Sequence, residues 1–269
     1  LTSSSRELAS EVPVQMNNPK PLKPFQALVE NYAIPAYGTI DPTPFVAVFY
    51  LAMFALMFAD VGHGLVVFLT GLIGMKYNKK KKRESMLFPL ITWCGAAAMV
   101  TGALFGSYFG MGLLPPLWFD YHGIVAGHGA EGSIQSLTDI LMITLYFGIT
   151  VISVGLLLNW INRIRLKQWF SLIWESGGIL VGWLYAAGTY CAFYFVGHEY
   201  KALPSTPVLA LILGVPVVLL GAKPLLERIR HRQHGEDVRM SPVEMVMEWV
   251  VELLEIFSGY LSNTLSFMR

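Results

Sequence analysis

Long apolar runs separated by short polar segments make up most of the chain after residue 43. The runs cover residues 44–77, 86–114, 134–160, 169–196, 208–222 and 243–269. Several of them reach or approach the roughly 20 residues that an α-helix needs to cross the hydrocarbon core of a bilayer. The pattern therefore predicts an all-α fold, a polytopic domain of transmembrane helices.

The first apolar run is too long for one ordinary span, and two interpretations compete for it. Residues 44–77 form either a single over-long helix or a short hairpin that turns near Asp60-Val-Gly-His-Gly64. The positions of the basic residues decide between them, because cytoplasmic loops of membrane proteins are enriched in Lys and Arg.

Three polar segments concentrate the positive charge of the chain. Segments 76–83, 163–167 and 223–239 hold 14 of the 19 Lys and Arg residues, whereas segments 115–133 and 197–207 hold one. Basic and non-basic loops alternate only if the first run is a hairpin. We therefore expect about seven spans, including a short first hairpin and a long terminal helix, with the basic loops in the cytoplasm.

The amino-acid composition is typical of a membrane protein, and its change along the chain predicts two domains. The chain is 54% hydrophobic and 14% charged, against about 25% charged residues in a typical soluble domain. Residues 1–42 are polar and proline-rich, so we expect a lead-in from a cytoplasmic domain, followed by a transmembrane domain over residues 43–269. Because the chain starts at Leu1 and stops within an apolar helix, we expect it to be part of a longer subunit.

The terminal helix carries one continuous polar stripe on an otherwise apolar surface. At 100° per residue, the following side chains fall on one side of it: Glu244, Glu248, Glu252, Glu255, Ser258, Ser262, Asn263, Ser266 and Arg269. A charged side chain at bilayer depth costs several kcal/mol by most estimates, so it usually faces a cavity, a partner or an ion path. For Glu244 and Glu248 a solvated cytosolic helix face explains the pattern equally well. Arg269 follows a long stretch without charge and points to ion translocation.

The length of this helix predicts its geometry. From residue 243 to Arg269 an upright helix rises roughly 40 Å at ~1.5 Å per residue, which exceeds the ~30 Å hydrocarbon core. An arginine that serves an ion path belongs near mid-depth. We therefore expect the helix to project into the cytoplasm or to tilt well beyond the ~20° average.

Other polar positions within the apolar runs are less distinctive. Glu175 lies inside the fifth predicted span and is either an interfacial residue or a carboxylate of a channel wall. Gly102, Gly106 and Gly110 repeat every four residues, which favours close packing of helices. The sequence contains no phosphate-binding loop, catalytic triad or zinc signature. We expect no catalytic residue, metal, cofactor or nucleic-acid partner.

Two stretches carry a resemblance to a known family. Residues 24–44, followed by Met57-Phe-Ala-Asp-Val-Gly-His-Gly64, resemble the membrane entry of subunit a, or subunit I, of vacuolar- and archaeal-type (V/A-type) rotary ATPases. Residues 255–269, Glu-Ile-Phe-Ser-Gly-Tyr-Leu-Ser-Asn-Thr-Leu-Ser-Phe-Met-Arg, are similar to the penultimate membrane helix of that family. The Pro-Thr-Pro and Ile-Asp-Pro-Thr sequences resemble bacterial and archaeal members, which implies a multi-pass protein of their plasma membrane.

The resemblance implies a stator subunit of an ion-translocating rotary ATPase that is not catalytic by itself. In the family, the membrane half lies against a rotating ring of proteolipids and provides two offset ion half-channels, and the cytoplasmic half connects to stalk subunits. By position, Arg269 is then the arginine that faces the ring carboxylates, and Glu255 belongs to the cytoplasmic half-channel. Asp60 and His63 match a family pattern in which Ala59 replaces a usual glycine, and a turn-stabilising role fits them equally well.

The chemistry of the stripe agrees with that assignment. A fixed guanidinium lowers the pKa of a ring carboxylate beside it and repels cations that would leak between half-channels. Arginine keeps its charge at any physiological pH. Ser262, Asn263 and Ser266 provide polar groups that support water around it. Two other classes stay open, a secondary transporter, which often shows internal repeats that this chain lacks, and a non-transporting membrane scaffold.

Overall fold

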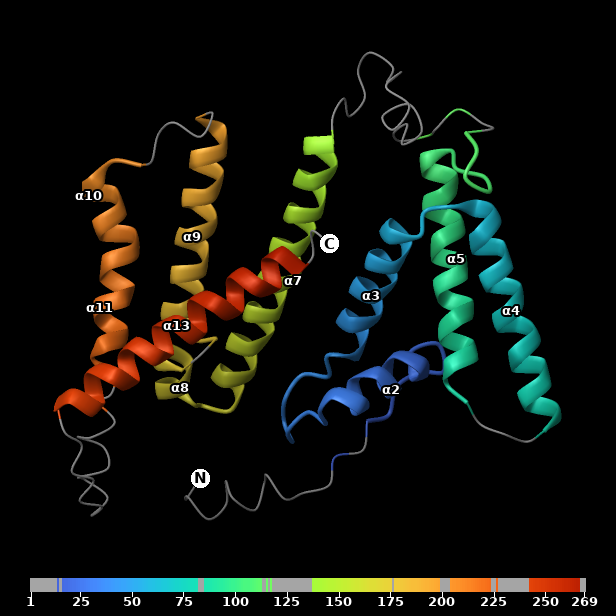
Figure 1. Ribbon diagram of the computed structural model, residues 1–269. Coiled ribbons are helices and arrows are strands. Elements are labelled where there is room, and N and C mark those ends of the chain that lie inside the picture. Colours follow the sequence, from blue (N-terminus) through green and yellow to red (C-terminus); the bar gives the residue numbers. More distant parts are fainter. Residues whose placement is uncertain are drawn as a thin grey trace. The chain divides into compact units, whose positions relative to one another are not determined.

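The computed structural model describes residues 14, 16–81, 85–112, 115, 117, 137–175, 177–198, 204–223, 226 and 242–266. Apart from one isolated β-bridge between Tyr108 and Met111, the regular structure in these residues is helical, which confirms the predicted fold class. The chain divides into two compact units, Leu1–Ile143 and Thr144–Arg269, and Figure 1 shows their helices.

The first unit contains α2 (Lys23–Tyr32), α3 (Thr43–Met57), α4 (Val61–Lys80) and α5 (Leu87–Phe105). The predicted break in the first apolar run is present, because α3 ends at Met57 and α4 begins at Val61. Both α3 and α4 pack against α5, one on each side of it in Figure 1.

Helices α4 and α5 form the most extensive helix pair in the described residues. Glycines on each helix admit the backbone of the other. A Cβ atom at Gly95 would lie 2.7 Å from Cα of Phe68, and one at Gly64 would lie 2.9 Å from the backbone nitrogen of Met99. Such contacts exclude any side chain larger than hydrogen, so the two backbones approach as closely as helices can.

Helix α2 closes one end of this unit. Phe25 is 2% exposed and lies in a cluster with Ala47 of α3 and with Leu90 and Cys94 of α5. Its ring meets that of Tyr50 edge-on at 6.4 Å. The polar segment before the first span therefore contributes a helix to the core of the unit.

The second unit contains most of α7, which begins before the division at Thr144, together with α8, α9, α10, α11 and α13. Their bounds are Leu137–Arg165, Trp169–Trp174, Ile179–Gly197, Thr206–Leu209, Val215–Gly221 and Pro242–Ser266. A buried cluster of Leu180 and Val181 from α9, Leu220 from α11 and Ile256 from α13 holds three of these helices together. Figure 1 shows α13 running at a slant to α9 and α11.

One turn of π-helix, Ala210–Gly214, lies between α10 and α11. Pro216, in the first turn of α11, lies two residues after it. Proline has no N–H to donate, and its ring clashes with the carbonyl four residues earlier in a regular α-helix. The wider turn relieves this clash, as is typical where the α-helical hydrogen-bond ladder is interrupted.

Three segments in the described residues are long and apolar enough to cross a membrane. They are Leu87–Phe105, Met142–Arg165 and Trp169–Phe195, and Thr43–Met57 and Thr206–Gly221 are shorter apolar helices. The predicted count of seven spans stays a prediction. Within Trp169–Phe195 the chain is not one continuous helix, because α8 ends at Trp174 and α9 begins at Ile179.

Candidate functional site

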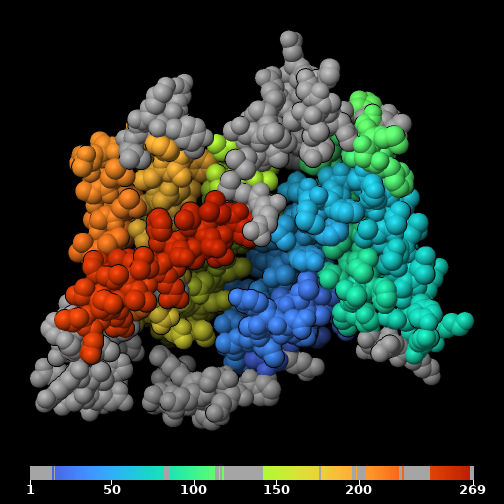
Figure 2. Space-filling view, in the orientation of Figure 1, coloured from blue at the N-terminus to red at the C-terminus, as the bar shows by residue number. Residues whose placement is uncertain are grey.

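Helix α13 presents three different sides. Trp249, Leu253, Ile256 and Tyr260 belong to the cluster shared with α9 and α11, and Ile256 is 5% exposed. A second row of side chains, spaced three or four residues apart, is apolar and exposed: Val243, Val246, Val250, Leu254, Phe257, Leu261 and Leu265. The polar stripe occupies the third side. Figure 2 shows α13 exposed along its length in this view.

The predicted ion-path residues of the stripe are uncovered in the part of the chain that the structure describes. Glu255, Ser262, Asn263 and Ser266 are all exposed. Among the described residues, Glu255 forms no hydrogen bond or ion pair. Arg269 lies outside the described residues, so its predicted position at the end of the stripe stays a prediction.

Glu252 differs from Glu255 although both belong to the same stripe. Its Oε1 lies 2.5 Å from Nζ of Lys223, just after α11, and the two side chains are 15% and 16% exposed. Close by, the indole Nε1 of Trp249 donates to the carbonyl of Val217 at 3.2 Å. Glu252 thus takes part in the contact between α11 and α13, a role that its place in the stripe does not reveal.

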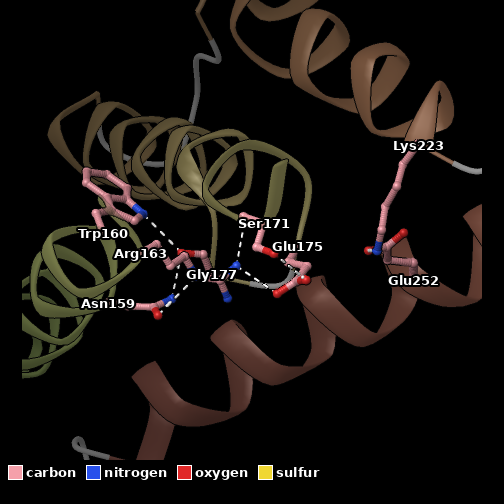
Figure 3. A network of polar contacts seen from close by, with 8 residues as sticks. All are labelled: Asn159, Trp160, Arg163, Ser171, Glu175, Gly177, Lys223 and Glu252. Carbon is pink, nitrogen blue, oxygen red and sulfur yellow. Dashed lines mark hydrogen bonds and ion pairs between the residues drawn. The ribbon is translucent and has the colours of Figure 1, made fainter. Parts of the chain in front are cut away.

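Glu175 lies in the turn between α8 and α9. Its Oε2 forms an ion pair with Nη1 of Arg163 at 2.7 Å, and its Oε1 accepts from Oγ of Ser171 at 2.7 Å. The same guanidinium also donates to the carbonyl of Ser171. These are the contacts of a residue that joins α7 to the turn (Figure 3). A channel-wall role for Glu175 stays a prediction.

Gly177 completes this turn. Its φ of 89° belongs to the left-handed region that glycine favours. Its carbonyl accepts from Nδ2 of Asn159 and from Nε1 of Trp160, each at 3.0 Å. A Cβ atom here would lie 2.7 Å from the Asn159 amide nitrogen. The backbone of the turn is therefore fixed to α7 by two side chains.

Asp60 organises the turn before α4 in the first unit. Its Oδ1 accepts from the backbone N–H of His63 at 2.8 Å, as a helix N-cap does, and from that of Phe109 at 3.1 Å. Its Oδ2 accepts from Oγ of Ser107 at 2.8 Å and from the N–H of Gly110 at 2.6 Å. Burial alone raises the pKa of this carboxyl, but the hydrogen bonds outweigh burial and hold the pKa well below its usual range.

His63 is the more accessible member of the pair. Its side chain is 55% exposed, and Nδ1 lies 3.1 Å from Oδ1 of Asp60. The ring contacts Phe58 and Phe109, with centroids 6.2 and 5.5 Å apart. Of the two roles considered for Asp60 and His63, this geometry supports turn stabilisation.

The partners of Asp60 help to explain the glycine repeat that begins in α5 and continues beyond it. Gly102 packs against the start of α4, as the packing interpretation predicts. Gly106 and Gly110 lie beyond the helix, with φ of 69° and 74°, and shape the loop that brings donors back to Asp60. Because Gly106 and Gly110 are not part of a helix, the helix-packing interpretation is wrong for them. The spacing of four residues does not by itself distinguish them from Gly102.

Comparison with known proteins places the chain in a family. The V-type ATPase 116kDa subunit family matches residues 3–114. The chain is 32% identical over 174 residues to V-type ATP synthase subunit I 2 of Treponema pallidum, covering 61% of this chain and 38% of that protein. It is 34% identical over 164 residues to A-type ATP synthase subunit I of Pyrococcus horikoshii, covering 61% and 24%.

The relatives are much longer than the part that matches. The A-type ATP synthase subunit I of Thermococcus kodakarensis is 38% identical over 106 residues, which cover 39% of this chain and 16% of that protein. The chain therefore spans well under half of the length of these relatives. The family match and the relatives all point to subunit I of V-type or A-type ATP synthases, and the helical fold has candidate membrane spans. The chain therefore belongs to the V/A-type ATPase subunit I/a family.

Proposed function

We propose that the chain is the membrane part of the stator subunit of a V/A-type rotary ATPase or ATP synthase. In this role it contributes ion half-channels and the arginine, Arg269, that faces the carboxylates of a rotating proteolipid ring. It translocates ions as a subunit and does not hydrolyse nucleotide itself. The observation that carries the proposal is the polar stripe of α13, whose members Glu255, Ser258, Ser262, Asn263 and Ser266 are exposed on a helix that packs through another side.

The physical reason is that a ring carboxylate needs two environments. It must be neutral to pass through lipid and ionised to exchange its ion. Exposed Ser262, Asn263 and Ser266 support hydration along the stripe, and a permanent guanidinium at its end stabilises the ionised form. Glu255 is placed to exchange ions with the cytoplasm about 21 Å along the helix from Arg269, at ~1.5 Å per residue.

The wider assignment follows from the same proposal. Residues 1–42 lead in from a cytoplasmic stator domain, and residues 43–269 form the transmembrane domain. The partners are the proteolipid ring, the peripheral and central stalk subunits, which are reached through the cytoplasmic domain, and membrane lipid. The bacterial and archaeal sources of the relatives, which are ATP synthase subunits, support a bacterial or archaeal plasma membrane.

The direct test changes Arg269 in the full-length subunit of the assembled complex. Arg269→Ala should abolish ATP-driven ion uptake by proteoliposomes without loss of any subunit, because the proposed role is confined to the rotor interface. Arg269→Lys should also be strongly impaired, since the pKa of lysine falls on desolvation. Normal uptake by Arg269→Ala in an intact complex would remove the proposal, and good function of Lys would indicate that the side chain merely reaches a headgroup.

Two further measurements test the proposed partners and the proposed membrane orientation. Native mass spectrometry of the purified complex should show a proteolipid ring and stalk subunits, which a scaffold or a secondary transporter would lack. Single-cysteine labelling with an impermeant reagent in right-side-out vesicles should modify Ile124→Cys and leave Lys80→Cys unmodified. The reverse pattern would contradict the proposed orientation, in which segments 76–85, 161–168 and 223–241 are cytoplasmic.

A further inference from the structure

The ammonium group of Lys223 is the point where charges from three parts of the second unit meet. It forms the 2.5 Å ion pair with Glu252 of α13. It also lies near enough to Glu175, in the turn between α8 and α9, for an electrostatic interaction. Figure 3 shows Lys223 reaching from the end of α11 toward Glu252, with the Glu175 and Arg163 pair nearby.

Besides the hydrogen bond from Nε1 of Trp249 to the carbonyl of Val217, the contacts that hold α13 in the described residues are mostly apolar and select one rotation of the helix less strongly than a charge pair does. The cluster of Leu180, Val181, Leu220 and Ile256 buries surface without directional bonds. An ion pair between two side chains that are each about 85% buried is different. If α13 rotated by one residue, about 100°, an apolar side chain would face Lys223, and a buried charge would lose its partner.

The pair also separates two glutamates that the sequence pattern treats alike. Glu252 and Glu255 are three residues apart on one side of the helix. Glu252 is held against α11, whereas Glu255 is exposed and has no partner among the described residues. The position of the lysine thus decides which carboxylate stays available at this level of the stripe.

We propose that Lys223 and Glu252 are positioning residues: their ion pair fixes the rotation of α13 against α11 and leaves Glu255, one turn further along the stripe, as an exposed carboxylate. The effect on ion transport rests on the proposed function, whereas the fixed rotation does not. Neither residue is required to touch the transported ion.

The experiment measures helix rotation and transport in the same complex. Tyr185 of α9 and Tyr260 of α13 have ring centroids 5.1 Å apart, about two turns of helix beyond the ion pair. Tyr185→Cys with Tyr260→Cys, in a full-length subunit with Cys94 and Cys191 replaced by Ser, reports the α9–α13 contact through cross-linking by a short bismaleimide. ATP-driven ion uptake is measured with the native tyrosines in place.

Removal and exchange of the charges give opposite results. Lys223→Met should lower the cross-linking yield several-fold and lower transport by a similar factor. The exchange of both residues, Lys223→Glu with Glu252→Lys, should restore at least half of each signal, and Lys223→Arg should retain both. The matched control is Lys167→Met, an exposed lysine of the same unit, which should change neither.

Each contrary result has a defined meaning. A wild-type cross-linking yield in Lys223→Met would overturn the proposal. If the exchanged pair restored cross-linking but not transport, Glu252 would act on the ion itself, and its role as a positioning residue would be wrong. If Lys223→Met prevents assembly, the exchanged pair decides, because failure of that variant to assemble also contradicts a simple ion pair. Failure of the proposed function appears separately, as normal transport by Arg269→Ala, and leaves the cross-linking result standing.

Discussion

Helices α4 and α5 of the first unit and helix α13 of the second are all long and largely apolar, but α13 is held in place by different contacts from those between α4 and α5. Glycines bring α4 and α5 into backbone contact, and Asp60 ties their connecting segments together. In the described residues, helix α13 is held by a side-chain cluster, the hydrogen bond of Trp249 and the ion pair of Glu252, and most of its surface is exposed. The first arrangement tolerates little change, and the second leaves a surface for other molecules.

The largest effect should come from filling the glycine contact. A Cβ atom at Gly102 would lie 2.5 Å from the carbonyl carbon of Asp60 and against the nitrogen of Val61, and backbone atoms cannot rotate away. Gly102→Leu should destabilise the first unit by more than about 3 kcal/mol. The measurement is thermal unfolding of the purified complex in detergent. Gly188→Leu, at a glycine with nothing within 4 Å of the added atom, is the control, and equal losses would refute the contrast.

Next comes the loss of the Asp60 carboxylate. The Asp60 carboxylate accepts hydrogen bonds from four donor groups. Asp60→Asn replaces one accepting oxygen by an NH₂ group that faces these donors, and should lower the free energy of unfolding by about 2 kcal/mol at pH 7. Because the folded pKa lies below the unfolded value of about 3.9, this stabilisation is present above that pH and is lost as the pH falls further.

The advantage of the wild type over Asp60→Asn should therefore shrink below about pH 4. Unfolding measured at pH 7 and at pH 3.5 in parallel, with exposed Glu30→Gln as control, tests the sign. A difference that grows on acidification would contradict the assigned hydrogen bonds.

A smaller effect is expected from the buried side of α13. Ile256→Ala should destabilise the second unit by about 2 kcal/mol, the low end of such changes, since under the proposed function lipid surrounds much of the helix. Leu254→Ala removes a side chain of similar size that is 64% exposed and should cost under about 0.5 kcal/mol. The pair is compared by protease resistance of the complex. A larger loss with Leu254→Ala would show that another subunit covers the exposed row.

The smallest change in stability should accompany the most specific change in function. Glu255→Gln keeps the shape of an exposed side chain and should alter stability by less than about 0.5 kcal/mol. Under the proposed function it should nevertheless slow ion uptake by reconstituted vesicles. Uptake at the wild-type rate would reduce Glu255 to a solvated surface charge, and Glu248→Gln provides the matched comparison.

The sequence predicted helices better than it predicted which residues meet. Apolar run lengths and the basic loops correctly indicated the break before α4 and one helix over most of 243–269. Three of the four donors to Asp60 come from residues 47 to 50 positions later, and the partner of Glu252 lies 29 positions earlier. Periodicity along one helix contains no information about such pairs, because they arise only when helices pack.

The interruption at Glu175 was missed for a related reason. Hydropathy averages over a window and does not register a short turn inside an apolar run, even though Gly177 and Gly178 follow. The candidate site was predictable as a stripe of residue types, but the difference between Glu252, which holds α13, and the exposed Glu255 required the neighbouring helix.

The π-helical turn at Ala210–Gly214 affects how this chain should be matched to its relatives. A π-turn spans one residue more than an α-turn at almost the same rise, so it acts as a single-residue insertion absorbed within a helix. A relative that lacks the π-turn has one residue fewer here. Its residues after the position of Pro216 are therefore offset by one from those of this chain, whereas its residues before the turn are not. An alignment without a gap here would pair Lys223 with the wrong neighbour, and the search for a partner of Glu252 in other sequences should allow for that shift.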